Sequence, residues 1–128
     1  MSSSSARLAE DGDIIITLSV AGRFLGCWAK PTLRILSSEV EAIHFSDAAT
    51  FGRCLRWRIA GTALSRQRAM GWFSVSGKRG RWAWVWMTPG REVVVVETTR
   101  SRPATVVFPK DWLDADSAMS IRQQLRDV

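Results

Sequence analysis

The sequence predicts a mainly β domain that is closed by one C-terminal helix. Between residues 13 and 108, short runs of β-branched and aromatic residues alternate with turn residues, as in an antiparallel barrel or sandwich. After residue 109 the apolar residues recur at the spacing of a helix instead of a strand. The 128 residues fit a single domain. No apolar run reaches the roughly 20 residues that span a bilayer.

Strands are expected wherever apolar residues alternate or cluster between turns. The serine-rich and then acidic residues 1–12 are expected to form a disordered tail, so that one domain covers residues 13–128. Residues 47–52 are expected to form a loop, and glycines on both sides of residues 78–79 favour a hairpin turn. The expected strands are residues 14–20, 24–29, 33–36 with 40–45, 56–60, 71–76, 81–87, 92–98 and 104–108, of which 92–98, with four consecutive valines, is the strongest.

The C-terminal segment is expected to be a short amphipathic helix. Asp114 suits the N-cap, and Ala118, Ile121, Leu125 and Val128 fall on one face. Because so short a helix is not stable alone, we expect it to pack on the sheet and to cover an opening of the barrel.

Arg58, Gly61-Thr62 and Gly71-Trp72-Phe73 have a distinctive spacing, and a turn, a valine-rich strand and a closing helix follow them. Over residues 55–125 this pattern resembles the bacterial pleckstrin-homology-like (PH-like) domains that are common in actinobacteria. The resemblance implies a seven-stranded, antiparallel and strongly bent barrel whose C-terminal helix plugs one end. It also implies an interaction module without enzymatic activity. Residues 64–70 depart from the family, which has small residues, proline and glycine there.

Positive charge is concentrated in the middle of the chain. The net charge is +6, with 15 arginines and 3 lysines, and no acidic residue lies between Asp47 and Glu92. That interval contains Arg53, Arg56, Arg58, Arg66, Arg68, Lys78, Arg79, Arg81 and Arg91. Arginine makes forked contacts with phosphates and carboxylates, so the interval favours an anion-binding face. The alternative is solubilising charge that pairs in space with Glu39, Glu41, Glu92, Glu97 or Asp111.

The tryptophans have two interpretations. Trp82, Trp84 and Trp86 share one face of a strand, so they either fill the core or form an exposed binding surface. Trp72 and Phe73 are adjacent on a strand and are therefore expected to point to opposite faces.

No motif for catalysis or metal binding occurs in the chain. Cys27 and Cys54 are expected to be reduced, half-buried small side chains. Two cysteines and the single His44 cannot supply four zinc ligands of these types. Phosphate-loop and dinucleotide-binding patterns are absent from the sequence. We therefore expect no catalytic residue, no metal and no cofactor.

These features predict a non-enzymatic interaction module that binds an acidic protein or an anionic membrane surface through its basic face. The predicted binding residues are Arg53, Arg56, Arg58, Arg66, Arg68, Trp72, Lys78, Arg79 and Arg81. Weak binding of a nucleic-acid backbone by the same arginines and a tryptophan is the alternative. A small molecule inside the barrel is the second alternative. The N-terminus lacks the features of a secretory signal, so we expect the chain in the cytoplasm or peripheral to the inner face of the membrane.

Overall fold

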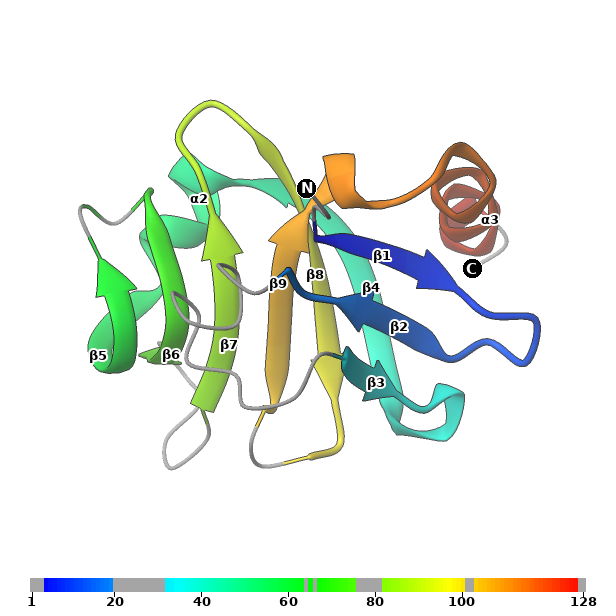
Figure 1. Cartoon of the computed structure of the whole chain (residues 1–128), viewed down its shortest axis with the longest axis horizontal. Coiled ribbons are helices and arrows are strands. Elements are labelled where there is room, and N and C mark those ends of the chain that lie inside the picture. Colours follow the sequence, from blue (N-terminus) through cyan, green and yellow to red (C-terminus); the bar gives the residue numbers. More distant parts are fainter. Residues whose placement is uncertain are drawn as a thin grey trace.

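A computed structural model of the chain describes residues 4–19, 32–63, 65, 67–75, 82–100 and 103–126. The expected mainly β fold with a C-terminal helix is confirmed (Figure 1). The strands are β1 (Ser5–Leu8), β2 (Ile14–Thr17), β3 (Thr32–Ile35), β4 (Val40–Asp47), β5 (Leu55–Ala63), β6 (Ala69–Val75), β7 (Trp82–Met87), β8 (Glu92–Thr98) and β9 (Thr105–Pro109). The helices are α2 (Ala48–Gly52) and α3 (Ala115–Arg126), with 3₁₀ turns η1 (Ser37–Glu39) and η2 (Lys110–Trp112).

The nine strands of the described residues form two sheets, whereas the family resemblance implies seven strands. The small sheet has the order β1-β2-β3, and the large sheet has the order β4-β8-β9-β7-β6-β5. The expectation of an entirely antiparallel arrangement is wrong at one place, because β7 and β9 run parallel and pair Ala83 with Thr105 and Val85 with Val107. The β8–β9 hairpin lies between β4 and β7 in the sheet. The second strand of this hairpin, β9, is therefore the neighbour of β7, and the two strands run in the same direction.

The large sheet is covered on both faces, which explains its continuous valine run. The side chains of Val94 and Val96 lie in one hydrophobic core, and those of Val93 and Val95 lie in the other. Successive strand residues point to opposite faces, so a strand covered on both sides needs apolar residues at every position. The first core packs the large sheet against the small sheet, which crosses in front of it in Figure 1, and against Ile121 of α3.

Two members of the tryptophan row, Trp84 and Trp86, lie in or against this first core. Trp84 is fully buried, and Trp86 is half-buried with its ring 5.5 Å from that of Trp112. Trp82 is half-buried and meets Trp72 edge to face at 6.2 Å. The structure therefore supports the interpretation of Trp84 and Trp86 as core residues.

The disordered tail expected for residues 1–12 is wrong at residues 5–8, which form β1. Ala6 pairs with Ile16, bridges to Leu113 and is only 3% exposed. The sequence carries little signal for this strand, because four residues with one small buried side chain show no clear alternation. Of residues 1–3 the structure describes nothing.

The loop expected over residues 47–52 is also wrong, because α2 forms there. The side chain of Asp47 caps this helix by accepting a hydrogen bond from the backbone N–H of Thr50 at 2.7 Å. Phe51 is buried and contributes to the second core. A helix of five residues is too short to display a helical period in the sequence.

Other expected boundaries agree closely with the structure. The valine-rich strand spans residues 92–98 as expected, and Asp114 caps α3 by accepting from the backbone N–H of Ser117 at 2.6 Å. The strand expected at residues 24–29 and the turn at residues 77–80 lie outside the described residues. Among the helices that are described, none is long and apolar enough to cross a membrane.

Candidate functional site

The strand β5 forms one edge of the large sheet, at the opposite end of the molecule from α3 (Figure 1). Among the described strands it pairs with β6 alone. The pairing shifts register twice, once between Leu55 and Arg58 and once between Arg58 and Ala60. Each shift places an extra residue on β5, and β-bulges of this kind bend a strand and increase its twist.

A pair of facing glycines follows the second register shift. Gly61 on β5 pairs with Gly71 on β6, and their φ angles are +123° and +125°. A Cβ atom built on Gly61 would lie 2.2 Å from the carbonyl oxygen of Met70. A Cβ on Gly71 would lie 2.4 Å from the carbonyl oxygen of Ala60. The two strands can therefore approach this closely only because both positions are glycine.

The bent strand borders a small pocket of about 150 Å³. It is lined by Leu55, Arg56, Arg58, Ala63, Ser65 and Phe73. Leu55 and Phe73 are buried, whereas Arg56 and Arg58 are exposed. The pocket thus combines an apolar floor with two guanidinium groups. The sequence places Arg56 and Arg58 on one strand, but it gives no sign of the bulges that form a pocket beside them.

Ser65 contributes a hydroxyl group that is held in place by a turn. Its Oγ accepts hydrogen bonds from the backbone N–H groups of Gln67 and Arg68, at 3.3 Å and 3.1 Å. A hydroxyl oxygen has two acceptor positions and one donor hydrogen. Both acceptor positions are used here, so the hydrogen is the part of this group that can serve a ligand.

Two further predicted residues flank the same strand. Arg53 follows α2 just before β5, and Arg68 lies just before β6; both side chains are exposed. We call the set Arg53, Arg56, Arg58 and Arg68 the arginine edge. The structure therefore keeps these four predicted residues around β5, and it brings Arg56 and Arg58 to one pocket.

Of the five carboxylates expected as partners, three form ion pairs with other described residues: Glu39, Glu92 with Lys110, and Asp111 with Arg91. Glu39 pairs with Arg100, and Arg34 pairs with Asp13 at 2.5 Å. Within the described ranges, no carboxylate forms an ion pair with Arg53, Arg58 or Arg68. The pKa of Asp47 is lowered mainly by the Thr50 backbone N–H, and Arg53 contributes least to this. Arg53, Arg58 and Arg68 therefore carry positive charge that no ion pair with a described carboxylate neutralises.

Trp72 does not join the arginine edge. Its side chain is half-buried against the first core, whereas its neighbour Phe73 lies in the second core and lines the pocket. The two aromatic residues thus face opposite sides of the sheet, as the sequence predicts. The other four predicted binding residues, Arg66, Lys78, Arg79 and Arg81, lie outside the described residues.

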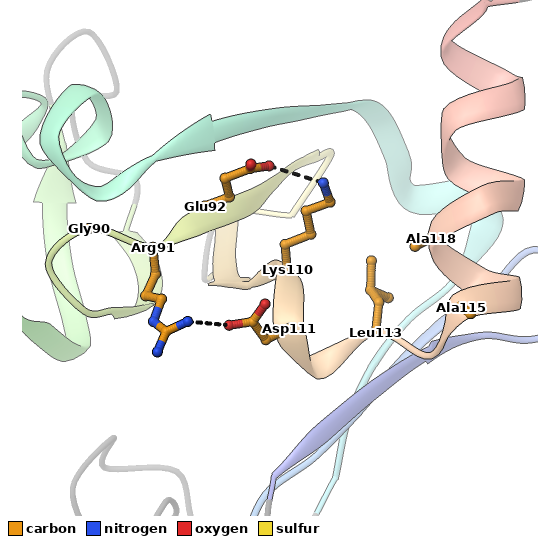
Figure 2. A pocket seen from close by; sticks show the side chains of 8 residues that line it. All are labelled: Gly90, Arg91, Glu92, Lys110, Asp111, Leu113, Ala115 and Ala118. Atoms are coloured by element: carbon orange, nitrogen blue, oxygen red, sulfur yellow. Dashed lines mark hydrogen bonds and ion pairs between the residues drawn. The ribbon is translucent and has the colours of Figure 1, made fainter.

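A wider depression, of about 520 Å³, lies between the β7–β8 turn, η2 and α3 (Figure 2). Two ion pairs occupy it: Arg91 Nη1 to Asp111 Oδ2 at 3.5 Å, and Lys110 Nζ to Glu92 Oε2 at 3.0 Å. Figure 2 shows the apolar side chains on the side toward α3; they are Leu113, which precedes the helix, and Ala115 and Ala118 on it. The sequence did not suggest this depression, because its walls come from three separate elements. Its charges already satisfy one another, so it offers no unpaired charge to a ligand. Here the alternative of paired surface charge holds for Arg91.

No group of three or more histidine, cysteine, aspartate or glutamate side chains is placed to hold a metal in the part of the chain that is described. His44 is exposed on β4, and Cys54 is a half-buried free thiol. Cys27 lies outside the described residues.

Comparison with models of protein families, with curated proteins and with solved structures finds no match for this chain.

Proposed function

We propose that this chain is a non-enzymatic interaction module that binds an acidic protein segment through the arginine edge. One observation carries the proposal. Arg53, Arg58 and Arg68 are exposed around a bent edge strand, and no described carboxylate forms an ion pair with any of them. Uncompensated arginines on a surface attract anionic partners over a distance and then make forked contacts with their carboxylates.

An acidic protein fits this surface better than an anionic membrane. The arginines border a concave pocket, whereas a lipid bilayer presents a flat surface. Peripheral membrane proteins also commonly insert a group of apolar side chains beside their basic residues. Of the exposed large apolar residues that the structure describes, Ile59 alone lies on β5, whereas Leu36 precedes η1 and Met119 lies on α3.

Nucleic acid is the weaker candidate. Binding of single strands generally combines basic residues with exposed aromatic rings on which bases stack. Trp72, the aromatic residue predicted for this role, lies on the other side of the sheet from the pocket. The resemblance to PH-like domains supports an interaction module, and we propose a cytoplasmic location for it.

The test compares two variants of equal net charge. In one, Arg56→Gln and Arg58→Gln alter the arginine edge; in the other, Arg7→Gln and Arg91→Gln remove two exposed arginines elsewhere. Binding of a fluorescent glutamate-rich peptide is measured by anisotropy, at about 50 mM and about 200 mM salt. We expect the first variant to lose about tenfold in affinity, which corresponds to about 1.4 kcal/mol, and the second to lose less than about twofold.

The same assay includes vesicles of phosphatidylcholine with phosphatidylserine, and a single-stranded oligonucleotide. Equal losses in the two variants would show that net charge alone binds the peptide, and the proposal would be wrong. Tighter binding of the vesicles or of the oligonucleotide than of the peptide would also overturn it. Circular dichroism confirms that both variants remain folded.

A further inference from the structure

We infer that the pocket on β5 is an anchoring site for a single glutamate side chain of the acidic partner. This inference rests on the proposed function and adds to it the group that is recognised. The pocket holds Arg56, Arg58 and Ser65 on its polar part and Leu55, Ala63 and Phe73 on its apolar part.

The polar part suits a carboxylate. A guanidinium group offers parallel N–H donors that match the two oxygens of a carboxylate, and that of Arg58, which forms no ion pair with a described carboxylate, borders this pocket. The hydroxyl hydrogen of Ser65 is a third donor, because its oxygen already accepts from Gln67 and Arg68. A planar group with two oxygens uses these donors fully. A phosphate has a third oxygen, which would face the apolar side chains and lose hydration.

The apolar part distinguishes glutamate from aspartate. Phe73 is 3% exposed and Leu55 is 6% exposed, so together they form a fixed apolar floor. The second methylene of glutamate would move out of water and pack against this floor, while the carboxylate reaches the arginines. Burying one methylene contributes about 0.8 kcal/mol, which corresponds to roughly fourfold in affinity.

The size of the pocket limits what it can bind. Sites for whole ligands or cofactors have volumes of roughly 300–1,000 Å³. At about 150 Å³ this pocket holds one side chain, and the rest of the partner would lie along the other residues of the arginine edge.

The bend that forms the pocket is part of the folded sheet. Two register shifts and the Gly61–Gly71 pair hold β5 in its curved path. A preformed site loses little conformational freedom on binding, so a single side chain can contribute measurable affinity there.

The experiment uses peptides that differ at one central position, which is glutamate, aspartate, glutamine or phosphoserine. Against the unmodified chain we expect glutamate to bind about fourfold tighter than aspartate and about tenfold tighter than glutamine. Phosphoserine should bind no more tightly than glutamate. Tighter binding of phosphoserine would assign the pocket to phosphate and overturn the inference.

Ala63→Leu is the decisive variant, because it fills the pocket and leaves the charge unchanged. Ala63 is exposed at the end of β5, so the longer side chain does not enter the core. We expect the preference for glutamate over aspartate and glutamine to disappear. Ala49→Leu, on the exposed side of α2, is the matched control and should retain the preference.

A second comparison tests the pocket without changing its volume. Arg58→Gln should abolish the preference for glutamate over glutamine. Arg53→Gln should instead lower the affinity for both peptides by the same factor. If the peptides bind at the arginine edge but Ala63→Leu and Arg58→Gln leave the preferences intact, this inference fails while the proposed function stands. If no peptide binds at the arginine edge, the proposed function itself fails.

Discussion

Gly61 and Gly71 face each other across β5 and β6, so close that a Cβ on either residue would lie 2.8 Å from the Cα of the other. Both residues have positive φ angles, which residues with side chains rarely adopt. The spacing of these glycines is the most specific part of the pattern in the sequence. The structure gives it a physical meaning, because the pair allows β6 to approach closely to β5, the strand that carries Arg56 and Arg58.

The first prediction concerns this close approach. Gly61→Ala should lower the free energy of unfolding by more than about 2 kcal/mol, because the new methyl group meets the Met70 carbonyl and the backbone is strained. Urea denaturation followed by fluorescence measures the change.

Gly90→Ala is the matched control. Gly90 also has a positive φ, of +76°, but a Cβ there would meet nothing within 4 Å. We expect Gly90→Ala to lower the free energy of unfolding by only about 1 kcal/mol, from the backbone conformation alone. Similar costs for the two substitutions would show that the close contact of β5 and β6 is not needed.

The second prediction concerns the N-terminal strand. Ala6 is 3% exposed, so Ala6→Asp would bury a charge without a partner and should cost at least about 2 kcal/mol of stability. Ser5→Asp adds the same charge at an exposed position of β1 and should change stability by less than about 0.5 kcal/mol. Thermal unfolding distinguishes the two variants. Equal tolerance of both would mean that β1 is not part of the folded domain.

The third prediction concerns pH. Arg100 Nη2 donates to Glu39 Oε1 at 2.7 Å, and this interaction is the main cause that lowers the pKa of Glu39 below its ordinary value of 4.5. A lowered pKa means that Glu39 stabilises the fold above about pH 4.5 and that this contribution is lost as the pH falls through the lowered value. Glu39→Gln should therefore be less stable than the unmodified chain at neutral pH, and the difference should shrink in acid.

Urea denaturation over a series of pH values measures this difference. Glu41→Gln, which removes the same charge from an exposed position of β4, is the control and should give a small difference at every pH. A Glu39→Gln difference that stays constant down to strongly acidic pH would contradict the assigned ion pair.

The fourth prediction concerns the attachment of α3. The backbone N–H of Leu8 donates to Ser117 Oγ at 2.9 Å, so this hydroxyl joins β1 to the first turn of the helix. Ser117 is 5% exposed, and Ser117→Ala should cost about 1–2 kcal/mol because the Leu8 N–H loses its acceptor. Ser120→Ala, on the exposed side of the same helix, should cost less than about 0.5 kcal/mol. Hydrogen exchange at the Leu8 amide should become faster only in the first variant.

Local sequence patterns predicted the fold well where one segment carries the whole signal. Residues 92–98 form a strand at the expected positions, and Asp114 caps the helix that follows. The elements that the sequence did not predict, β1 and α2, are four and five residues long, which is too short to display a clear period. The parallel β7–β9 pair was missed because strand order depends on contacts between segments that are distant in the sequence.

The candidate site was predicted in part. The sequence placed Arg56 and Arg58 on one strand and showed that no acidic residue lies near them along the chain. It grouped Trp72 with them, but Trp72 lies on the face of the sheet that packs against the first core. Ser65, which lines the pocket, was not singled out, since its hydroxyl acquires a role only through the turn that it forms with Gln67 and Arg68.

By itself the sequence determined the mainly β class, the closing helix and the concentration of positive charge in the middle of the chain. These follow from the periodicity of neighbouring residues and from composition. The tertiary structure alone decided which charges pair and which do not. Arg91 meets Asp111 from another element, whereas no described carboxylate forms an ion pair with Arg58. It also decided that Gly61 and Gly71 meet and that Arg56 and Arg58 border one pocket. Both outcomes depend on distances between segments far apart in the chain, and folding alone sets those distances.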